Sequence, residues 1–249
     1  MASLPATWAP AEDTLAGRTV LITGATGGLG SAAALACARA GASVVLLGRK
    51  VPALEVLYDT ILAGGGVEPA IYPMDLAGAT PHDYDELATT IERECGALHG
   101  IVHAAVHFAG LSQVGDTSPD EWLRSLQVGL TAPFLLTQAC LPLLKAQADS
   151  AVVFVLDDET RIGKAFWGGY GAAKAGLRGL ASILHQETEN GPVRVQALLP
   201  APMRTALRRM AYFGENTMIW PEPAATAPAV VYLLSDAGHV VRGEILDLR

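Results

Sequence analysis

Charged and aromatic residues are scarce in this sequence of 249 residues: 17% carry a charge at neutral pH and 6% are Phe, Trp or Tyr. Disorder needs low hydrophobicity and dense charge, and 51% of the residues are hydrophobic, so a disordered chain is excluded. The apolar excess is Ala, Leu, Val and Gly, a composition that suits a parallel sheet buried on both faces. We therefore predict one α/β domain with a large core.

Basic residues and long apolar runs are also few. The formal net charge of −8 argues against nucleic acid as a partner, because phosphate neutralisation needs a clustered Lys/Arg surface. Polar residues and prolines interrupt residues 126–144, so we predict no membrane span. Residues 1–5 lack the basic and apolar parts of a secretory signal. We expect a cytoplasmic protein whose ligand is a small molecule.

The three cysteines, Cys37, Cys95 and Cys140, are odd in number and far apart in helix-like stretches. Free thiols in a reducing compartment fit this pattern better than a disulfide or a metal site. His103 and His107 are four residues apart, but around a predicted strand end, with no Cys, Asp or Glu at ligand spacing. We predict no metal site.

Short β-branched runs alternate with helix-like stretches along the chain. This pattern predicts a single-domain Rossmann fold, a doubly wound, mostly parallel sheet of seven strands with helices on both faces. The predicted strands are 19–23, 43–47, 68–72, 100–105, 151–156, 193–198 and 244–248. The predicted helices are 31–40, 51–63, 81–95, 118–145, 168–190 and 222–235. Residues 1–17 are interpreted as an N-terminal arm before a domain at 18–249, and residues 200–221 as an irregular insertion.

A glycine-rich turn, Thr23–Gly30, lies between the first predicted strand and the first helix. Its glycines permit a tight turn and a close approach of the backbone to a pyrophosphate at the helix N-terminus. We predict dinucleotide binding here, and the alternative is a glycine loop kept only for packing. The predicted cofactor contacts in this turn are Gly24, Thr26, Gly28, Leu29 and Gly30.

The end of the second predicted strand should meet the adenosine ribose. It carries Arg49 and Lys50 and no carboxylate, which favours the 2′-phosphate of NADP(H) over the free hydroxyl of NAD(H). Alternatively, both cations are solvated loop residues. Asp75, after the third strand, could accept from an adenine amino group or cap the next turn, and Leu76 beside it is a further predicted contact.

Tyr170 and Lys174 are four residues apart and therefore share one face of a predicted helix. An ammonium beside a phenol favours the phenolate and lowers the pKa of the Tyr from its usual value of about 10. Such a phenol can transfer a proton at neutral pH. We predict that this pair is catalytic.

Together with the glycine turn, this pair makes the chain resemble the classical short-chain dehydrogenase/reductase family over about residues 15–248. Two segments, 137–144 and 167–170, are similar to a subgroup of bacterial oxidoreductases of that family without assigned substrates. The resemblance implies a nicotinamide enzyme acting on a carbonyl or an alcohol. In such an enzyme Tyr170 exchanges a proton with the substrate oxygen, while Lys174 binds the ribose and tunes the Tyr.

The resemblance implies further features of the molecule. Ala104 and Pro200 stand at family positions that contact the cofactor. The insertion at 200–221 is where the family builds a mobile substrate lid. The helices at 120–145 and 168–190 are expected to pair across a two-fold axis, giving a homodimer or a homotetramer.

Two positions depart from the family's catalytic set. The family's Ser, 13 residues before the Tyr, is Asp157, and its Asn aligns to Gly129. An ionised Asp157 would oppose a phenolate at Tyr170 and repel a developing alkoxide. Gly129 removes a side-chain amide that, in the family, helps to hold a helix bend and a relay water.

These departures leave two hypotheses open. The first is an NADP(H)-dependent oxidoreductase of altered mechanism, in which Asp157 joins Tyr170 and Lys174 and orients or receives a hydroxyl or a cationic substrate. The second is an NADP(H)-binding regulatory or partner subunit with little turnover.

The neighbours of these residues also have two interpretations each. Arg161 and Lys164 could offset the acids at 157–159, although exposure to water is the simpler interpretation. Trp167 could line the substrate pocket or anchor the core. Several large residues of the insertion could touch the ligand: Met203, Met210, Tyr212, Phe213, Met218 and Trp220.

Overall fold

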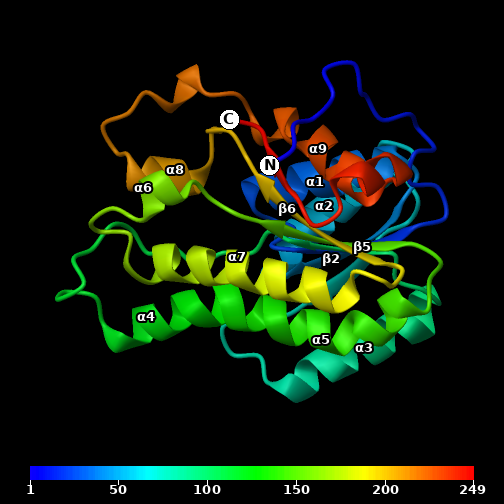
Figure 1. Ribbon diagram of the computed structural model, residues 1–249, viewed down its shortest axis with the longest axis horizontal. Helices are drawn as coiled ribbons and strands as arrows, with labels where there is room; N and C mark the ends of the chain where they lie inside the picture. The colour runs from blue at the N-terminus through cyan, green and yellow to red at the C-terminus, as the bar shows by residue number, and fades with distance from the viewer.

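The computed structural model describes residues 1–249 as one sheet of seven strands with a layer of helices on each face (Figure 1). All neighbouring strands are parallel, in the order β3-β2-β1-β4-β5-β6-β7, which confirms the predicted doubly wound sheet. The strand order changes direction between β1 and β4, which places a binding crevice at their carboxyl ends. The strands are β1 (Thr19–Thr23), β2 (Ser43–Gly48), β3 (Ala70–Pro73), β4 (Gly100–His103), β5 (Ser150–Val155), β6 (Val193–Leu199) and β7 (Ile245–Asp247).

The helices form two layers because alternate residues of each strand face opposite sides of the sheet. On β1, Val20 and Ile22 enter one core and Leu21 enters the other. The first layer contains α1 (Gly28–Arg39), α2 (Val51–Ala63) and α9 (Ala227–Leu234). The second contains α3 (Pro81–Cys95), α4 (Pro119–Leu126), α5 (Ala132–Lys145) and α7 (Gly168–Thr188). Two short helices, α6 (Glu159–Ile162) and α8 (Ala206–Ala211), lie beside each other at one end of the molecule (Figure 1).

The helix predicted over 118–145 is divided by a π-helical turn at Gln127–Thr131. Pro133 accounts for this turn, because it has no N–H to donate and its ring is incompatible with the carbonyl of Gly129 in a regular α-helix. At Gly129 an added Cβ would lie 2.9 Å from the Cβ of Ala173 on α7, so the turn occurs where the two helices approach closely. The whole segment, Pro119–Lys145, is long and apolar enough to span a membrane, but in this fold it contacts α3 and α7.

Other element boundaries differ from the prediction by a few residues. β4 ends at His103 instead of residue 105, because the side-chain oxygen of Thr23 accepts the N–H groups of Ala104 (3.1 Å) and Ala105 (3.2 Å) and draws the chain away from the ladder. The last helix begins at Ala227, after a 3₁₀ turn, instead of at residue 222. The insertion at 200–221 is not wholly irregular, since it contains α8, and α6 was not predicted.

The N-terminal arm contacts the edge of the sheet. Ala2 forms a parallel bridge with β7: its N–H donates to the carbonyl of Ile245 at 2.9 Å, and its carbonyl accepts from Asp247 at 2.9 Å. The two chain ends therefore lie close together (Figure 1).

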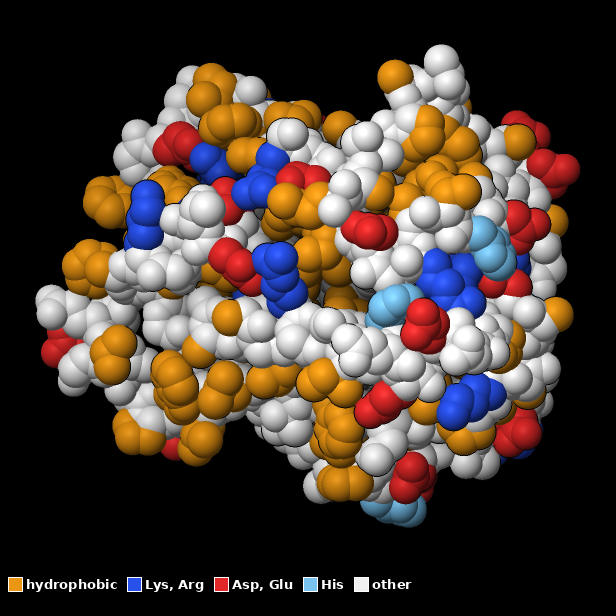
Figure 2. All heavy atoms as spheres, viewed as in Figure 1, with side chains coloured by type: hydrophobic (Ala, Val, Ile, Leu, Met, Phe, Trp, Pro, Cys, Tyr) orange, Lys and Arg blue, Asp and Glu red, His pale blue; other side chains and the backbone are white.

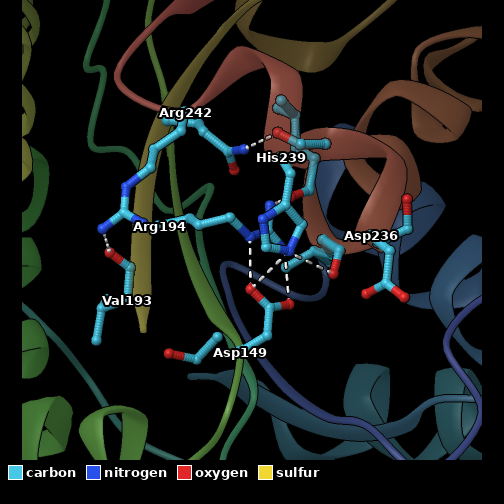
Figure 3. A network of polar contacts seen from close by, with 12 residues as sticks. Asp149, Val193, Arg194, Asp236, His239 and Arg242 are labelled. Carbon is cyan, nitrogen blue, oxygen red and sulfur yellow. Dashed lines mark hydrogen bonds and ion pairs between the residues drawn. The ribbon is translucent and has the colours of Figure 1, made fainter. Parts of the chain in front are cut away.

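An ion-pair network lies at the amino ends of β5 and β6, opposite the predicted cofactor end (Figure 3). Arg194 on β6 is fully buried and binds Asp149 through two contacts of 2.7 and 3.0 Å. Its guanidinium also donates to the carbonyl of Leu233 on α9 at 2.9 Å. Asp149 and Asp236 come within reach of His239, but both carboxylates are paired with Arg18. This network joins β5, β6 and α9.

Candidate active site

Two positions of the glycine turn require the absence of a side chain. Gly24 has φ +65°, and an added Cβ would lie 2.8 Å from the Cα of Ala105. A Cβ at Gly30 would lie 2.1 Å from the carbonyl oxygen of Gly24. The turn therefore brings the first residues of α1 against the end of β1. Unpaired N–H groups in the first turn of a helix bind phosphate, so the residues present fit a dinucleotide.

A cavity of about 400 Å³ opens over this turn. It brings together eight of the predicted site residues: Gly28, Leu29, Gly30, Ala104, Asp157, Tyr170, Lys174 and Pro200. The segment after β6 supplies Met203, Thr205 and Arg208 to the wall, and Thr205 lies next to Gly28. Two arginines that the sequence did not place here, Arg161 and Arg249, also line the cavity.

The residues predicted to bind the adenosine end lie outside the cavity wall. Arg49 is more than half exposed and its guanidinium is 3.9 Å from the carboxylate of Asp75. Lys50 directly precedes α2, and Thr26 lies beside Gly48 at the end of β2.

Asp75 caps the turn that follows β3, since its carboxylate accepts the N–H of Ala77 at 3.1 Å. Of the two roles expected for Asp75, the observed contact is the turn cap. Leu76 is buried, and its carbonyl accepts a long hydrogen bond of 3.4 Å from Gln127.

Tyr170 donates its hydroxyl proton to Asp157 Oδ2 at 2.6 Å. Burial raises the pKa of Tyr170 well above its usual value, and the charge and hydrogen bond of Asp157 raise it further. The expected effect of Asp157 on the phenol is thus confirmed. The expected lowering of the Tyr170 pKa by Lys174 is wrong, because desolvation and the nearby carboxylate dominate.

Lys174 lies on the same face of α7, with its ammonium turned to the end of β5. Its Nζ donates to the carbonyl of Val155 at 2.6 Å, and burial lowers the pKa of Lys174 to about 8. The ammonium therefore loses its charge only above neutral pH. It lines the same cavity as Tyr170 and the glycine turn.

Arg161 turns towards Asp157 and is only partly exposed, contrary to the simpler interpretation of the sequence. Its guanidinium forms an ion pair with Asp157 Oδ1 and lies over the rings of Trp167 (4.8 Å) and Tyr212 (5.9 Å). Its position is set by α6, where Asp158 accepts the N–H of Thr160 at 3.0 Å as the N-cap. An Asp cap followed by Arg at residue 161 was the sequence signal for this one-turn helix.

Arg208 links distant parts of the segment after β6. Its guanidinium binds Glu215 through contacts of 2.6 and 2.7 Å and lies 4.4 Å from the centre of the Trp220 ring. Among the apolar residues predicted to touch ligand, Met203 lines the cavity. Three others point mainly to solvent: Met210, Phe213 and Met218.

A second cavity of about 240 Å³ lies next to the first, and Tyr170 contributes to both walls. Trp167 lines this second cavity and is also buried against Tyr170, so it serves as both pocket wall and core anchor. Phe108 stacks on Trp167 with ring centres 5.4 Å apart. Phe166, on the rim, has φ +77°, a conformation that is costly for a residue other than glycine.

The two histidines have partners that spacing did not predict. His107 Nε2 lies 2.7 Å from the carboxylate of Glu121. His103 is buried, shares a hydrogen bond of 2.8 Å with Thr137 and stacks on Phe154. Burial, with a smaller effect of the Lys174 charge, lowers the pKa of His103 to about 3, so it is neutral at physiological pH.

Comparison with known proteins decides the family. The model of the short chain dehydrogenases matches residues 18–214. This chain is a classical short-chain dehydrogenase/reductase. The oxidoreductase YciK of Escherichia coli K12 is 33% identical over 238 residues, which cover 96% of this chain and 94% of that protein. Cyclohexanol dehydrogenase of Acinetobacter is 29% identical over 233 residues, 91% of each chain.

Solved structures of other short-chain dehydrogenases superpose closely. One from Shigella flexneri, in complex with NADP, gives a TM-score of 0.91 at 32% identity and covers 95% of this chain and 99% of its own. Another, from Escherichia coli CFT073 in complex with NADPH, gives a TM-score of 0.91 at 33% identity. It covers 96% of this chain and 99% of its own. A π-helical turn is present at Gly129, where the resemblance to the family implies an Asn.

Proposed function

We propose that this short-chain dehydrogenase/reductase is an NADP(H)-dependent oxidoreductase that interconverts a carbonyl and an alcohol on a small molecule. The observation that carries the proposal is the convergence of Tyr170, Lys174 and the glycine turn on one cavity. When bound, a nicotinamide cofactor supplies or accepts a hydride. In this site the Tyr170 hydroxyl exchanges a proton with the substrate oxygen, and Lys174 holds the ribose.

NADP(H) is the proposed cofactor because the ribose position carries Arg49 and Lys50 and no carboxylate. The contact of Arg49 with Asp75 is long and exposed to solvent, which leaves the guanidinium available for a 2′-phosphate. The relatives from Shigella flexneri and Escherichia coli that were solved with NADP and NADPH support the same choice.

The second candidate is an NADP(H)-binding regulatory or partner subunit with little turnover. Two points favour it: the resemblance places Asp157 at the position of the family's Ser, and the pKa of Tyr170 is raised instead of lowered. A phenol with a high pKa is a poor general acid at neutral pH.

We propose a cytoplasmic homodimer or homotetramer that binds neither nucleic acid nor membrane. Hydrophobic side chains gather along α4 and α5 (Figure 2). Leu123 on α4, Phe134 on α5 and Ile183 on α7 are 61%, 44% and 57% exposed, as expected of side chains that a second copy would cover.

The test combines cofactor binding with turnover. NADPH and NADH are titrated by fluorescence, and NADPH oxidation is followed with a panel of aldehydes and ketones, and NADP⁺ reduction with the matching alcohols. We expect NADPH to bind at least about tenfold more tightly than NADH. Tyr170→Phe should lower turnover by about 100-fold or more while NADPH affinity stays within about twofold.

The outcomes separate the two candidates. NADPH binding without turnover across the panel supports the regulatory subunit. A protein that binds neither cofactor contradicts both candidates.

A further inference from the structure

The negative charge of Asp157 must be compensated if the reacting oxygen is to carry negative charge during the reaction. Its side chain is 12% exposed and contacts the Tyr170 hydroxyl directly. A buried carboxylate without a partner would oppose negative charge on the reacting oxygen. The charged or titratable groups that face Asp157 are Tyr170 and Lys174 from α7 and Arg161 from α6, and Tyr212 lies against Arg161 from the other side.

The two oxygens of Asp157 have different partners. Oδ2 accepts the Tyr170 hydroxyl at 2.6 Å, while Oδ1 is paired with Arg161 and accepts the N–H of Asp158 at 2.7 Å. One carboxylate thus links the phenol to the guanidinium. Lys174 forms no ion pair with Asp157; its ammonium donates to the carbonyl of Val155.

Arg161 is itself held in a defined position. Its guanidinium lies over the rings of Trp167 and Tyr212, and a planar guanidinium stacks well on aromatic faces. The side chain is 25% exposed and lines the main cavity. Tyr212 directly follows α8, so the guanidinium connects Asp157 to the segment after β6.

We propose that Arg161 is a positioning residue of the reaction: it neutralises Asp157 and holds that carboxylate on the Tyr170 hydroxyl, so that a carboxylate can stand where the family has Ser. Arg161 acts through Asp157. Its removal therefore harms the reaction only while Asp157 is present. This inference rests on the proposed function.

The first experiment needs no turnover. The ¹³Cζ resonance of Tyr170 is recorded at about pH 7 in the full-length protein and assigned with Tyr170→Phe. It reports the hydrogen bond that the Tyr170 hydroxyl donates to Asp157. In Arg161→Gln we expect this resonance to move by more than its line width, because the guanidinium no longer holds the carboxylate beside the hydroxyl. Arg161→Lys keeps the charge and should stay near wild type. An unmoved resonance in Arg161→Gln overturns the proposal.

Arg178→Gln is the matched control. Arg178 on α7 binds Glu159 of α6 at 2.8 Å, so this variant also removes an arginine paired with a carboxylate at α6. Arg178 does not line the cavity, and we expect the Tyr170 resonance and turnover to be unchanged.

The second experiment is a double-mutant cycle on turnover. We expect Arg161→Gln to lower kcat about tenfold or more in the wild-type background, Arg161→Lys to restore part of it, and NADPH affinity to stay within about twofold. In an Asp157→Ser background the same change should cost less than about twofold. An equal loss in both backgrounds overturns the role of Arg161, whereas absence of turnover in wild type overturns the proposed function instead.

Discussion

His103 and Lys174 are basic side chains that the fold removes from water, one at the end of β4 and one in α7. Burial lowers the pKa of each, to about 3 and about 8. Tyr170 responds to the same burial in the opposite direction, because its charged form is the anion. At this scale the surroundings, more than the residue type, set the protonation state.

The low pKa of His103 predicts a loss of stability in acid. Between about pH 6.5 and 3 the unfolded state binds a proton at this His and the folded state does not, so the free energy of unfolding falls as pH falls through that window. The contribution is about 1.4 kcal/mol per pH unit. Urea denaturation at pH 7, 6 and 5 should show a shallower fall for His103→Asn than for wild type.

His82→Asn is the control for this titration, since His82 is exposed on α3. This variant measures how much the replacement of an exposed His by Asn changes the pH dependence of stability. If His103→Asn matched wild type, the buried neutral state of His103 would be contradicted.

The strand–turn–helix element at β1 and α1 was the most predictable part of the molecule. Gly24 and Gly30 stand where a Cβ has no room, so their spacing directly encodes the turn. Capping contacts open other helices: Thr80 with Asp83 opens α3, and Ser118 caps α4. The π-helical turn was missed because its cause, Pro133 acting on Gly129, lies inside one helix-like pattern.

Gly30→Ala should disable the cofactor end. The new Cβ would meet the carbonyl oxygen of Gly24 at 2.1 Å, so the turn must open and the amides at the start of α1 must move. We expect NADPH affinity to fall by at least about 100-fold and the free energy of unfolding to fall by about 1–3 kcal/mol. Fluorescence titration and urea denaturation measure the two effects.

Gly179→Ala is the matched control, because Gly179 lies within α7 and has open space around its Cα. The same substitution should raise stability by about 0.5–1 kcal/mol and leave NADPH affinity unchanged. NADPH affinity that survives Gly30→Ala would show that the pyrophosphate does not bind at this turn.

Over the whole molecule, the candidate active site and the largest buried ion-pair network lie at opposite ends of the strands. The cavity is formed at the carboxyl ends of the strands, and the ion-pair network of Arg194 and Asp149 lies at the amino ends of β5 and β6 (Figure 3). The network ties segments that are far apart in the sequence, so it bears on global stability and not on the site.

Arg194→Met tests this division. It leaves Asp149 with less compensation in a partly buried position, and removal of one partner of a buried pair costs about 3–5 kcal/mol. Urea denaturation should show that loss, while the folded variant keeps the NADPH affinity of wild type. Arg93→Met, which removes an exposed pair with Glu94, should change stability by less than about 0.5 kcal/mol. A similar small change in both variants would contradict the structural role of Arg194.

The sequence by itself determined the alternation of strands and helices, the glycine turn and the Tyr170/Lys174 pair, because each depends on local propensity or short spacing. It also identified Asp157 and its effect on Tyr170, through the position of the family's Ser. Only the tertiary structure decided that Arg161 turns inward to Asp157, that Lys174 donates to Val155 and that His103 stays neutral. These outcomes depend on which groups meet across separate elements and on how far each is removed from water, and neither is encoded in local sequence.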